Sequence, residues 1–518
     1  MKTISFALLL VILGPAMAHA QAPTRLVTYP KLPPRDALER MKLAMPWTAR
    51  VTVDGNRDGI ASMQLIPDAS KLLLIVQTHK GAVFLFDAER GDLIWKTSVG
   101  IPFSNVQPVA FNSQSIYVTR RNVLHALDRG SGAQQVFTYD PITKLFSYGW
   151  TMEFTPNATP IADEDFLYVP MANRVQSILL PDFEIFARAR AYRAQLKRNE
   201  KGDVKQDELL RMFEAAQLDS LDSPQPDFYW GFGLADQLTT SSPLIYEEQI
   251  SVLTTDGAFT SVNRYGKGGR IENFTFKTAG KVLGAAGQHQ HVAYLASDDY
   301  NLYAVSMKGG ELLWRHVSGA PLLTKPEVND RDVFIAPKGV GLRRVDRLGG
   351  REVWTNRDTR TFLAANNHYV YALDQNGVLF VLDERRGTTL AKLDLMDWKI
   401  AIPNEWNDRI YLAANDGQVM CLRHKDLAKQ LIMKTTATAK PKEEKKPIEE
   451  KKKEEEKKDE KEKDKDKDKD KDKEKDKAVK VGRQVAPPVP MRIAAPLEPA
   501  LGRRVDADRD ERRRRVGP

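Results

Sequence analysis

Residues 72–95 read LLLIVQTHKGAVFLFDAERGDLIW, a pattern typical of antiparallel β-structure. An apolar, β-branched run is followed by a polar turn containing Gly81 and then by a second apolar run that closes on Asp87. Two such runs around a glycine-containing turn indicate a β-hairpin. Asp87 also opens a spaced motif, Asp87-x3-Gly91-x3-Trp95, in which Asp and Gly suit a tight turn. We therefore expect a hairpin and then a tight turn into an outer strand.

The same layout recurs through most of the chain. Eight copies can be aligned, at residues 72–87, 116–128, 166–180, 250–263, 292–306, 333–346, 369–383 and 410–422. Several closing positions lie 37 to 43 residues apart, and the interval between the third and fourth copies is about twice as long. A period near 40 residues, with about four strands per unit, is the signature of a β-propeller. The sequence therefore predicts an all-β, eight-bladed β-propeller with one insertion.

The spaced motif also recurs, in full or in part. Gly and Trp stand at the same spacing at residues 310/314 and 350/354, whereas the copies at Asp128 and Asp383 keep the Gly and lack the Trp. A Trp at a fixed distance can pack its apolar face between neighbouring blades and leave its N–H to find an acceptor. We therefore expect Trp95, Trp314 and Trp354 to lie buried between blades.

These hairpins with their D-x3-G-x3-W motif resemble the tryptophan-docking repeat of the pyrroloquinoline-quinone (quinoprotein) β-propeller family. The resemblance covers about residues 45–423. It implies the propeller fold, but this fold hosts both enzymes and non-catalytic scaffolds.

The two ends of the repeat array complement each other. The last hairpin is followed by RHKDLAKQ, residues 423–430, which contains neither Gly nor Trp. Trp47 lies 25 residues before the first hairpin, close to the 21 residues that separate Trp95 from the hairpin at Ile116. We therefore expect residues 47–53 to supply the outer strand of the eighth blade and to close the ring, which removes free sheet edges.

The N-terminus predicts export. Residues 1–20 combine a basic start at Lys2, an apolar run over 6–13 and a small-x-small cleavage site at 18–20, as in a secretory signal peptide. No later segment is long and apolar enough to span a bilayer. The expected location is extracytoplasmic, in the periplasm or secreted. Cys421 is the only cysteine, so no intrachain disulfide can form and the core alone must stabilise the fold.

The remaining segments complete the expected domain organisation. An N-terminal extension (21–44) precedes the propeller (45–430), and the Ala-, Arg- and Leu-rich residues 184–220 predict two short helices or a decorated loop. Residues 436–480 are rich in Lys, Glu and Asp and should form a disordered spacer, followed by a Pro/Arg-rich basic tail at 481–518. These segments contribute much of the net charge of +9, so the propeller itself is only mildly basic. We therefore expect no specific nucleic-acid partner; the Arg cluster at 512–515 is a candidate contact for anionic surfaces, or a solvated tail.

The sequence contains no complete catalytic site of a known kind. Quinoprotein dehydrogenases resemble this chain in repeat type; they use calcium held by carboxylates, a catalytic Asp and aromatic side chains around the quinone, and many also use an adjacent cysteine pair. A chain with one cysteine cannot form that pair. No residue matches a complete family site, so no catalytic or cofactor-binding residue is assigned. Trp230 could line an axial pocket or belong to the core.

Two patterns could hold a metal. Asp54-x-Asn56-x-Asp58-Gly59 has the first half of a calcium loop, but Leu65 stands at the twelfth position, where a bidentate Glu is needed. The alternative is a polar turn without metal. His289-x-His291 has zinc-compatible spacing, with no further Cys or His nearby.

Two function classes remain. The favoured one is an exported, non-catalytic scaffold that binds protein or peptide partners, as the propeller of the outer-membrane β-barrel assembly machinery does, with no cofactor expected. The alternative is a quinone-dependent (PQQ) dehydrogenase that binds the quinone and calcium and oxidises alcohols or sugars. The partner and the oligomeric state do not follow from the sequence.

Overall fold

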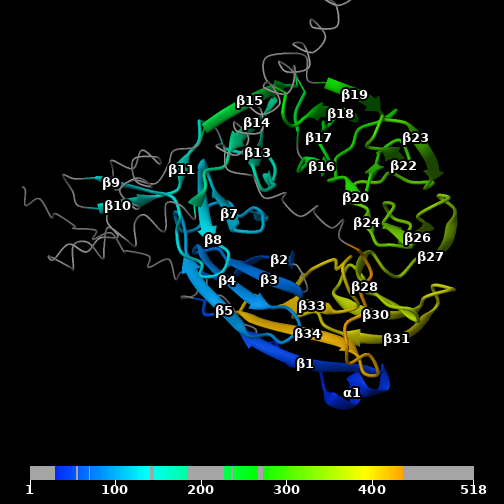
Figure 1. Ribbon diagram of the computed structural model, residues 1–518. Coiled ribbons are helices and arrows are strands. Elements are labelled where there is room, and N and C mark those ends of the chain that lie inside the picture. The colour runs from blue at the N-terminus through cyan, green and yellow to red at the C-terminus, as the bar shows by residue number, and fades with distance from the viewer. Residues whose placement is uncertain are drawn as a thin grey trace, which may run out of the picture. The chain divides into compact units, whose positions relative to one another are not determined.

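The computed structural model describes residues 30–53, 57–68, 71–140, 145–153, 155–183, 227–234, 237–239, 241–266 and 272–435. All of these belong to the first of the chain's two units, Met1–Ala437. Within these residues, eight four-stranded sheets and one two-stranded sheet are present, and the eight sheets form the blades of a ring (Figure 1). The predicted eight-bladed β-propeller is confirmed. The expected signal peptide (1–20), insertion (184–220) and tail segments (436–480 and 481–518) lie outside the described residues.

Each blade is an antiparallel meander whose first strand lies nearest the ring axis (Figure 1). Blades 1 to 4 consist of β2–β5 (Ile60–Asp68, Lys71–Thr78, Ala82–Asp87, Leu93–Ser98), of β6, β7, β8 and β11 (Ala110–Phe111, Ser115–Arg120, Val123–Asp128, Trp150–Thr151), of β12–β15 (Ile161–Ala162, Phe166–Met171, Arg174–Leu179, Asp227–Gly233) and of β16–β19 (Leu244–Tyr246, Gln249–Leu253, Ala258–Asn263, Glu272–Lys277). Blades 5 to 8 consist of β20–β23 (Gly287–His289, Val292–Ala296, Asn301–Ser306, Leu312–Val317), of β24–β27 (Glu327–Val328, Asp332–Ile335, Leu342–Asp346, Glu352–Asn356), of β28–β31 (Thr361–Ala365, Tyr369–Leu373, Val378–Asp383, Thr389–Asp394) and of β32–β34 with β1 (Ile400–Ala401, Ile410–Ala413, Gln418–His424, Leu43–Arg50).

Two described elements were not expected from the sequence. A hairpin of β9 and β10 (Phe137–Asp140, Leu145–Tyr148) interrupts blade 2 between β8 and β11. A single-turn helix, α1 (Arg35–Arg40), precedes β1 and buries Leu38. The outer strand of blade 3, β15, follows the predicted insertion, which explains the long interval between the third and fourth repeats.

Burial explains the two kinds of apolar pattern in the repeat. The second strands β7 and β13 are buried at every position, because neighbouring blades cover both faces of each sheet. Outer strands such as β31 alternate between partly buried and exposed side chains, because only one of their faces meets another blade. Continuous apolar runs therefore mark the middle of a blade and alternating runs mark its rim.

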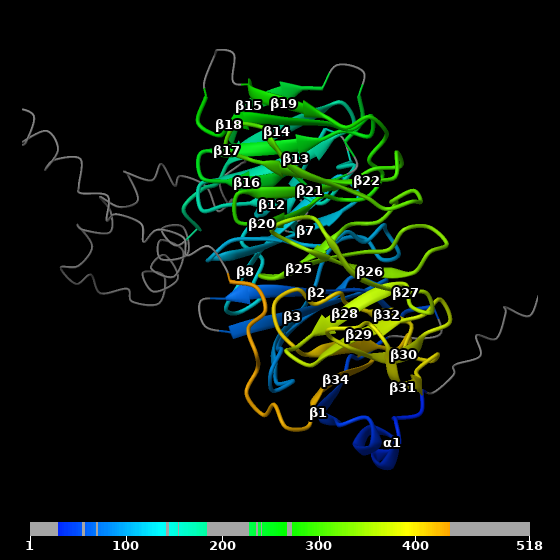
Figure 2. The ribbon, with the colours of Figure 1, turned by 90° about the vertical axis from the view of Figure 1, so that its right-hand side faces the viewer.

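The ring is closed by pairing its two ends. β1 runs antiparallel to β34, with Trp47 opposite Cys421 and Arg50 opposite Gln418. The two strands lie side by side in both ribbon views (Figures 1 and 2). The expected closure is confirmed, although the strand begins at Leu43 and ends at Arg50 instead of covering residues 47–53. Closure leaves blade 8 with four strands like the others.

A Trp on the outer strand of one blade docks on the turn of the next blade. The Trp95 Nε1–H donates to the Arg129 carbonyl at 2.9 Å, and the indole ring lies over Gly132, whose φ is +71°. A Cβ atom at Gly132 would meet the ring at 2.5 Å, so both the space and the backbone conformation require glycine. The Asp-x3-Gly part of each motif thus receives the Trp of the preceding blade.

The same docking recurs around the ring. The Nε1–H groups of four further Trp residues donate to the corresponding carbonyls in the next blade: Trp47 to Ala88, Trp230 to Arg264, Trp314 to Arg347 and Trp354 to Glu384. Trp95 and Trp354 are buried as expected, whereas Trp314 is only partly buried. In blade 4, Phe274 lies over Gly310 and fills the place of the indole without its hydrogen bond.

Where blade 7 meets blade 8, the Trp and the glycine are lost together. Ala391 stands in blade 7 where the motif would place Trp, and no Gly follows β34 in blade 8. The ring of Tyr369 stacks on His424 at this junction, with centroids 5.3 Å apart. A blade without the docking Trp needs no glycine in the next blade. The Trp and the Asp-x3-Gly part of the motif therefore act as a pair that spans two neighbouring blades.

An ion pair network ties blade 8 to blade 1. Arg409 is fully buried and its guanidinium lies 2.7 Å from Glu89 in the β4–β5 turn of blade 1 and 3.0 Å from Asp408. Charge-assisted hydrogen bonds to both carboxylates compensate for the burial of the guanidinium. The closing junction therefore combines strand pairing, Trp47 docking and this buried ion pair network.

Deleting residues 21–53 removes β1 and is expected to open the ring. The lost partner of β34 and the lost Trp47 docking should lower the thermal unfolding midpoint sharply and expose β34 to aggregation. Circular dichroism melting compares this variant with one lacking only residues 21–29. Equal midpoints for the two variants would contradict closure by β1.

Trp95→Ala is expected to cost about 3–5 kcal/mol of unfolding free energy, as for other buried large aromatic side chains. Gly132→Ala should be costly in the native background, because its Cβ meets the indole, and less costly when Trp95 is already Ala. Urea denaturation of the single and double variants measures this coupling, which we expect to be about 1–2 kcal/mol for residues in contact. Strictly additive effects would show that the two residues do not act as a pair.

Candidate functional site

The innermost strands surround a cavity of about 620 Å³ on the ring axis, lined by both apolar and polar side chains. Its wall comes from blades 1 to 6 and blade 8 and from the chain that follows the last strand. Most of the polar lining consists of amides and hydroxyls: Gln64, Asn105, Gln107, Asn157, Thr159, Ser242 and Gln288. We call this cavity the axial channel.

Prolines position several of these side chains. Gln107, Thr159, Ser242 and Lys325 each precede a proline that leads into the innermost strand of its blade. A residue before proline is held in an extended conformation, and proline has no N–H to leave unpaired at the free edge that faces the channel. The lining residues therefore occupy a fixed backbone, and the inner edges of the blades are blunted.

The amides of the wall also join neighbouring blades. Gln64 exchanges two hydrogen bonds with the backbone of Val109, at 3.1 and 2.8 Å. The Gln107 Nε2 donates to the Pro156 carbonyl at 2.8 Å, and the Gln288 Nε2 donates to the Ile245 carbonyl at 2.8 Å. The Gln107 Oε1 is buried and has no hydrogen-bond partner among the described residues.

A charged cluster occupies one side of the channel. The Lys325 ammonium lies 2.9 Å from Glu327 and 2.8 Å from Glu405, and Lys434 also pairs with Glu405. Burial raises the pKa of Glu327 above its usual range. Burial also raises the pKa of Glu405, but the two lysines outweigh this effect and hold that pKa below its usual range. The cluster thus balances two cations against two carboxyl groups.

The carboxyl groups of the charged cluster are already paired with lysines, which disfavours a calcium site there. Calcium needs six to eight oxygen ligands, several of them carboxylates. The carboxylates in the charged cluster already face Lys325 and Lys434, which repel a further cation. Among the residues that the structure describes, no group of three His, Cys, Asp or Glu side chains is placed to hold a metal. Cys421, the only cysteine of the chain, lies buried in β34, so no cysteine pair can form.

The structure describes part of the expected calcium loop. Asp54 and Asn56 lie outside the described residues. Asp58 is buried, and its Oδ1 accepts hydrogen bonds from the backbone N–H groups of Gly59 at 2.9 Å and Lys80 at 3.0 Å. Asp58 therefore holds the segment that leads into β2 against the β3–β4 turn.

The two histidines of the possible zinc pair have separate partners. The His289 Nε2 lies 2.7 Å from Asp330 in blade 6, and its ring is buried. The His291 ring instead lies 6.1 Å from that of Tyr246. Trp230, a candidate for an axial pocket, lies on outer strand β15, where it docks on blade 4.

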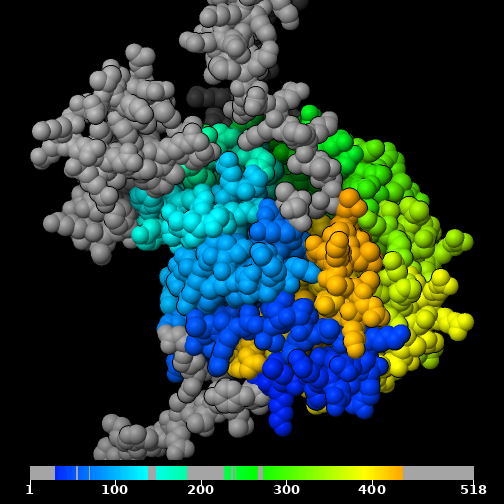
Figure 3. Space-filling view, turned by 60° about the horizontal axis from the view of Figure 1, so that its bottom comes forward, coloured from blue at the N-terminus to red at the C-terminus, as the bar shows by residue number. Residues whose placement is uncertain are grey.

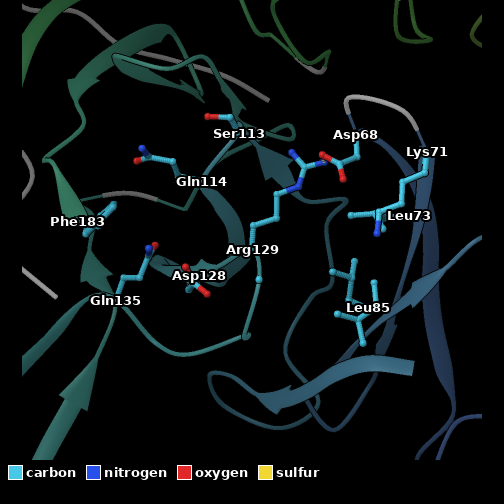
Figure 4. Close-up of a pocket in the computed structure, with 12 residues that line it drawn as sticks. Asp68, Lys71, Leu73, Leu85, Ser113, Gln114, Asp128, Arg129, Gln135 and Phe183 are labelled. Atoms are coloured by element: carbon cyan, nitrogen blue, oxygen red, sulfur yellow. Dashed lines mark ion pairs between the residues drawn. The ribbon is translucent and has the colours of Figure 1, made fainter. Parts of the chain in front are cut away.

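A second cavity, of about 500 Å³, lies between blades 1 and 2 (Figure 4). Its apolar surface comes from Leu73, Leu85, Ile94 and Phe183. The Arg129 guanidinium crosses it to the Pro67 carbonyl at 2.8 Å and the Asn112 carbonyl at 2.6 Å, and pairs with Asp68. Since these three groups already bind the guanidinium, Arg129 offers no free cation to a ligand in this cavity.

Sequence reasoning missed the charged cluster of the axial channel. Lys325 and Glu405 are 80 residues apart, and Glu405 and Lys434 are 29 apart. No local motif brings them together, because they lie in different blades and in the segment after the last strand. The recurring residue-before-proline positions were the available signal for the rest of the wall.

Comparisons with known proteins agree with this geometry. Residues 267–390 match the family model described as outer membrane protein assembly factor BamB. The structure of BamB from Moraxella catarrhalis superimposes with a TM-score of 0.50 at 14% identity, covering 74% of this chain and 98% of that one. A computationally designed protein, Ika8, gives a TM-score of 0.47 at 11% identity over 71% of this chain and 97% of its own. No curated protein sequence matches.

At these identities, the structural likeness establishes the fold and nothing finer. The family match covers β19 to β30 and the beginning of β31, including the complete motif that ends at Trp354 and the copy that ends at Trp314 with Ser306 in place of Asp. The resemblance noted in the sequence is confirmed over residues 267–390, and the structural likeness shows the β-propeller fold.

Proposed function

We propose that this chain is an exported propeller scaffold that binds protein or peptide partners and performs no chemistry itself. The observation that carries the proposal is the composition of the axial channel. Its wall offers amides and hydroxyls, and its nearby charges are already paired with one another. Such a wall can form hydrogen bonds with a polar ligand, whereas oxidation by a quinone needs a free base and an electrophilic cation.

A peptide segment suits this wall on chemical grounds. An extended backbone presents a donor and an acceptor at every residue, and these can pair with amide and hydroxyl side chains arranged around an axis. The Gln107 Oε1 is buried with no hydrogen-bond partner among the described residues, and Asn157 is an exposed part of the same wall. Specific binding would depend on these positions more than on net charge.

The expected place of action is the cell envelope. The N-terminal residues have the pattern of a secretory signal peptide, and no helix among the described residues is long and apolar enough to cross a membrane. The family whose model matches is described as an outer membrane protein assembly factor. A role in envelope assembly, by contact with other envelope proteins, follows as part of this proposal.

A photo-activated cross-linking residue at Asn157 is expected to capture a discrete protein partner in cells, identified by mass spectrometry of the cross-linked peptides. The matched control carries the same residue at Lys308, an exposed position outside the channel wall. The scaffold proposal predicts a defined adduct from residue 157 and none of the same mass from residue 308. Identical adduct patterns at both sites would count against a binding role for the channel.

Purified mature protein is expected to show no micromolar binding of the quinone in calorimetry, with or without calcium, because the described channel wall lacks a free carboxylate set. It should also fail to reduce a redox dye in the presence of a panel of alcohols and sugars. Quinone binding together with dye reduction would replace the scaffold by a quinone-dependent dehydrogenase.

A further inference from the structure

After its last strand, the chain does not leave the ring directly. Residues 425–435, which we call the strap, continue from the end of β34 and lie across one face of the ring, where the end of the described chain appears in orange (Figure 3). The Arg409 guanidinium fixes the beginning of the strap by donating to the carbonyls of Leu427 at 3.3 Å and Ala428 at 3.0 Å. The strap thus starts from the same buried Arg that joins blades 8 and 1.

The middle of the strap packs on blades 6 to 8. Backbone N–H groups of Leu431 and Met433 donate to the Asp408 carboxylate and the Trp406 carbonyl, at 2.9 and 2.8 Å. Met433 is buried in the apolar cluster that contains Phe334 and Phe362. The strap therefore covers a junction of blades with an apolar side chain of its own.

The end of the strap reaches the axial channel. Thr435 donates from its backbone N–H to the Asp330 Oδ1 at 3.0 Å and from its hydroxyl to the Oδ2 at 2.7 Å. The Asp330 N–H in turn donates to the Met433 carbonyl at 2.8 Å. Lys434 lies in the channel wall and pairs with Glu405. One side chain, Asp330, thus anchors the point from which the charged C-terminal segment continues.

We propose that the strap is a latch over one mouth of the axial channel, held by Asp330 and Glu405 and able to open while the propeller stays folded. Opening moves Lys434 out of the wall and widens the mouth. A partner that binds the chain beyond residue 435 acts on this latch first, because Thr435 is its last anchored residue among those described.

The pattern of hydrogen bonds favours opening of the strap before unfolding of the blades. The only ladder contact of the strap within the described chain is the isolated bridge between Asn407 and Ile432, and Ile432 is 56% exposed. β34, by contrast, pairs along its length with both β1 and β33. Segments with few buried contacts and little strand pairing open at lower free energy than the core.

A cysteine in the channel wall reports on the latch. Ser242→Cys places a thiol there by a nearly isosteric change, and the native Cys421 is fully buried, so the unmodified chain serves as the blank. The rate of labelling by a fluorescent maleimide is measured in full-length protein. Adding Asp330→Ala should raise this rate at least tenfold, whereas adding Glu153→Ala, which breaks an exposed ion pair with Arg174 on blade 3, should leave it unchanged.

Equal labelling rates with and without Asp330→Ala would overturn the latch. If the Asp330 variant does not fold, hydrogen exchange of the unmodified full-length chain decides. The amides of residues 431–435 should then exchange at least a hundredfold faster than those of β33 in native buffer. Exchange of both segments at the global unfolding rate would also overturn the proposal. Neither measurement depends on what the channel binds, so both remain separate from the test of the scaffold function.

Discussion

The indole of each docking Trp covers apolar surface that a single blade cannot bury by itself. A four-stranded sheet of this size has two apolar faces and no means of covering both, so its stability depends on its neighbours. The Trp supplies a large apolar surface and a directed hydrogen bond in one side chain, and the positive-φ glycine opposite gives it space. Most blades of the described ring therefore provide an aromatic docking group to the next blade.

Exceptions to the docking pattern show how the ring tolerates change. Phe274 keeps the apolar surface and gives up the hydrogen bond, and the junction of blades 7 and 8 replaces both with the stack of Tyr369 on His424. The junction of blades 8 and 1, next to the non-covalent pairing of β1 with β34, has the additional buried network around Arg409. Different junctions of the ring thus use different contacts.

The fold could be predicted because its signals are local. Hairpins, tight turns and the Gly–Trp spacing lie within 24 residues of one another, and Trp47 in the right frame was enough to predict closure. Trp230 was not recognised as a docking residue because the insertion separates it from its hairpin. The channel wall could not be predicted, since Lys325, Glu405 and Lys434 lie far apart in the sequence and meet only in the folded ring. The strap was missed for the same reason: RHKDLAKQ has no strand pattern, and its partners lie in other blades.

Pairing of β1 with β34 also sets the order of folding. About 370 residues separate the two strands, so β1 leaves the ribosome, and any export channel, long before its partner exists. At synthesis rates of about 5–20 residues per second, this wait lasts on the order of tens of seconds. Earlier blades can form hairpins and dock pairwise in that time, but the ring itself is completed by its most sequence-distant contact, the kind that forms slowly. β1 is therefore the first strand of the ring to be made, and it has no strand partner until β34 has been synthesised.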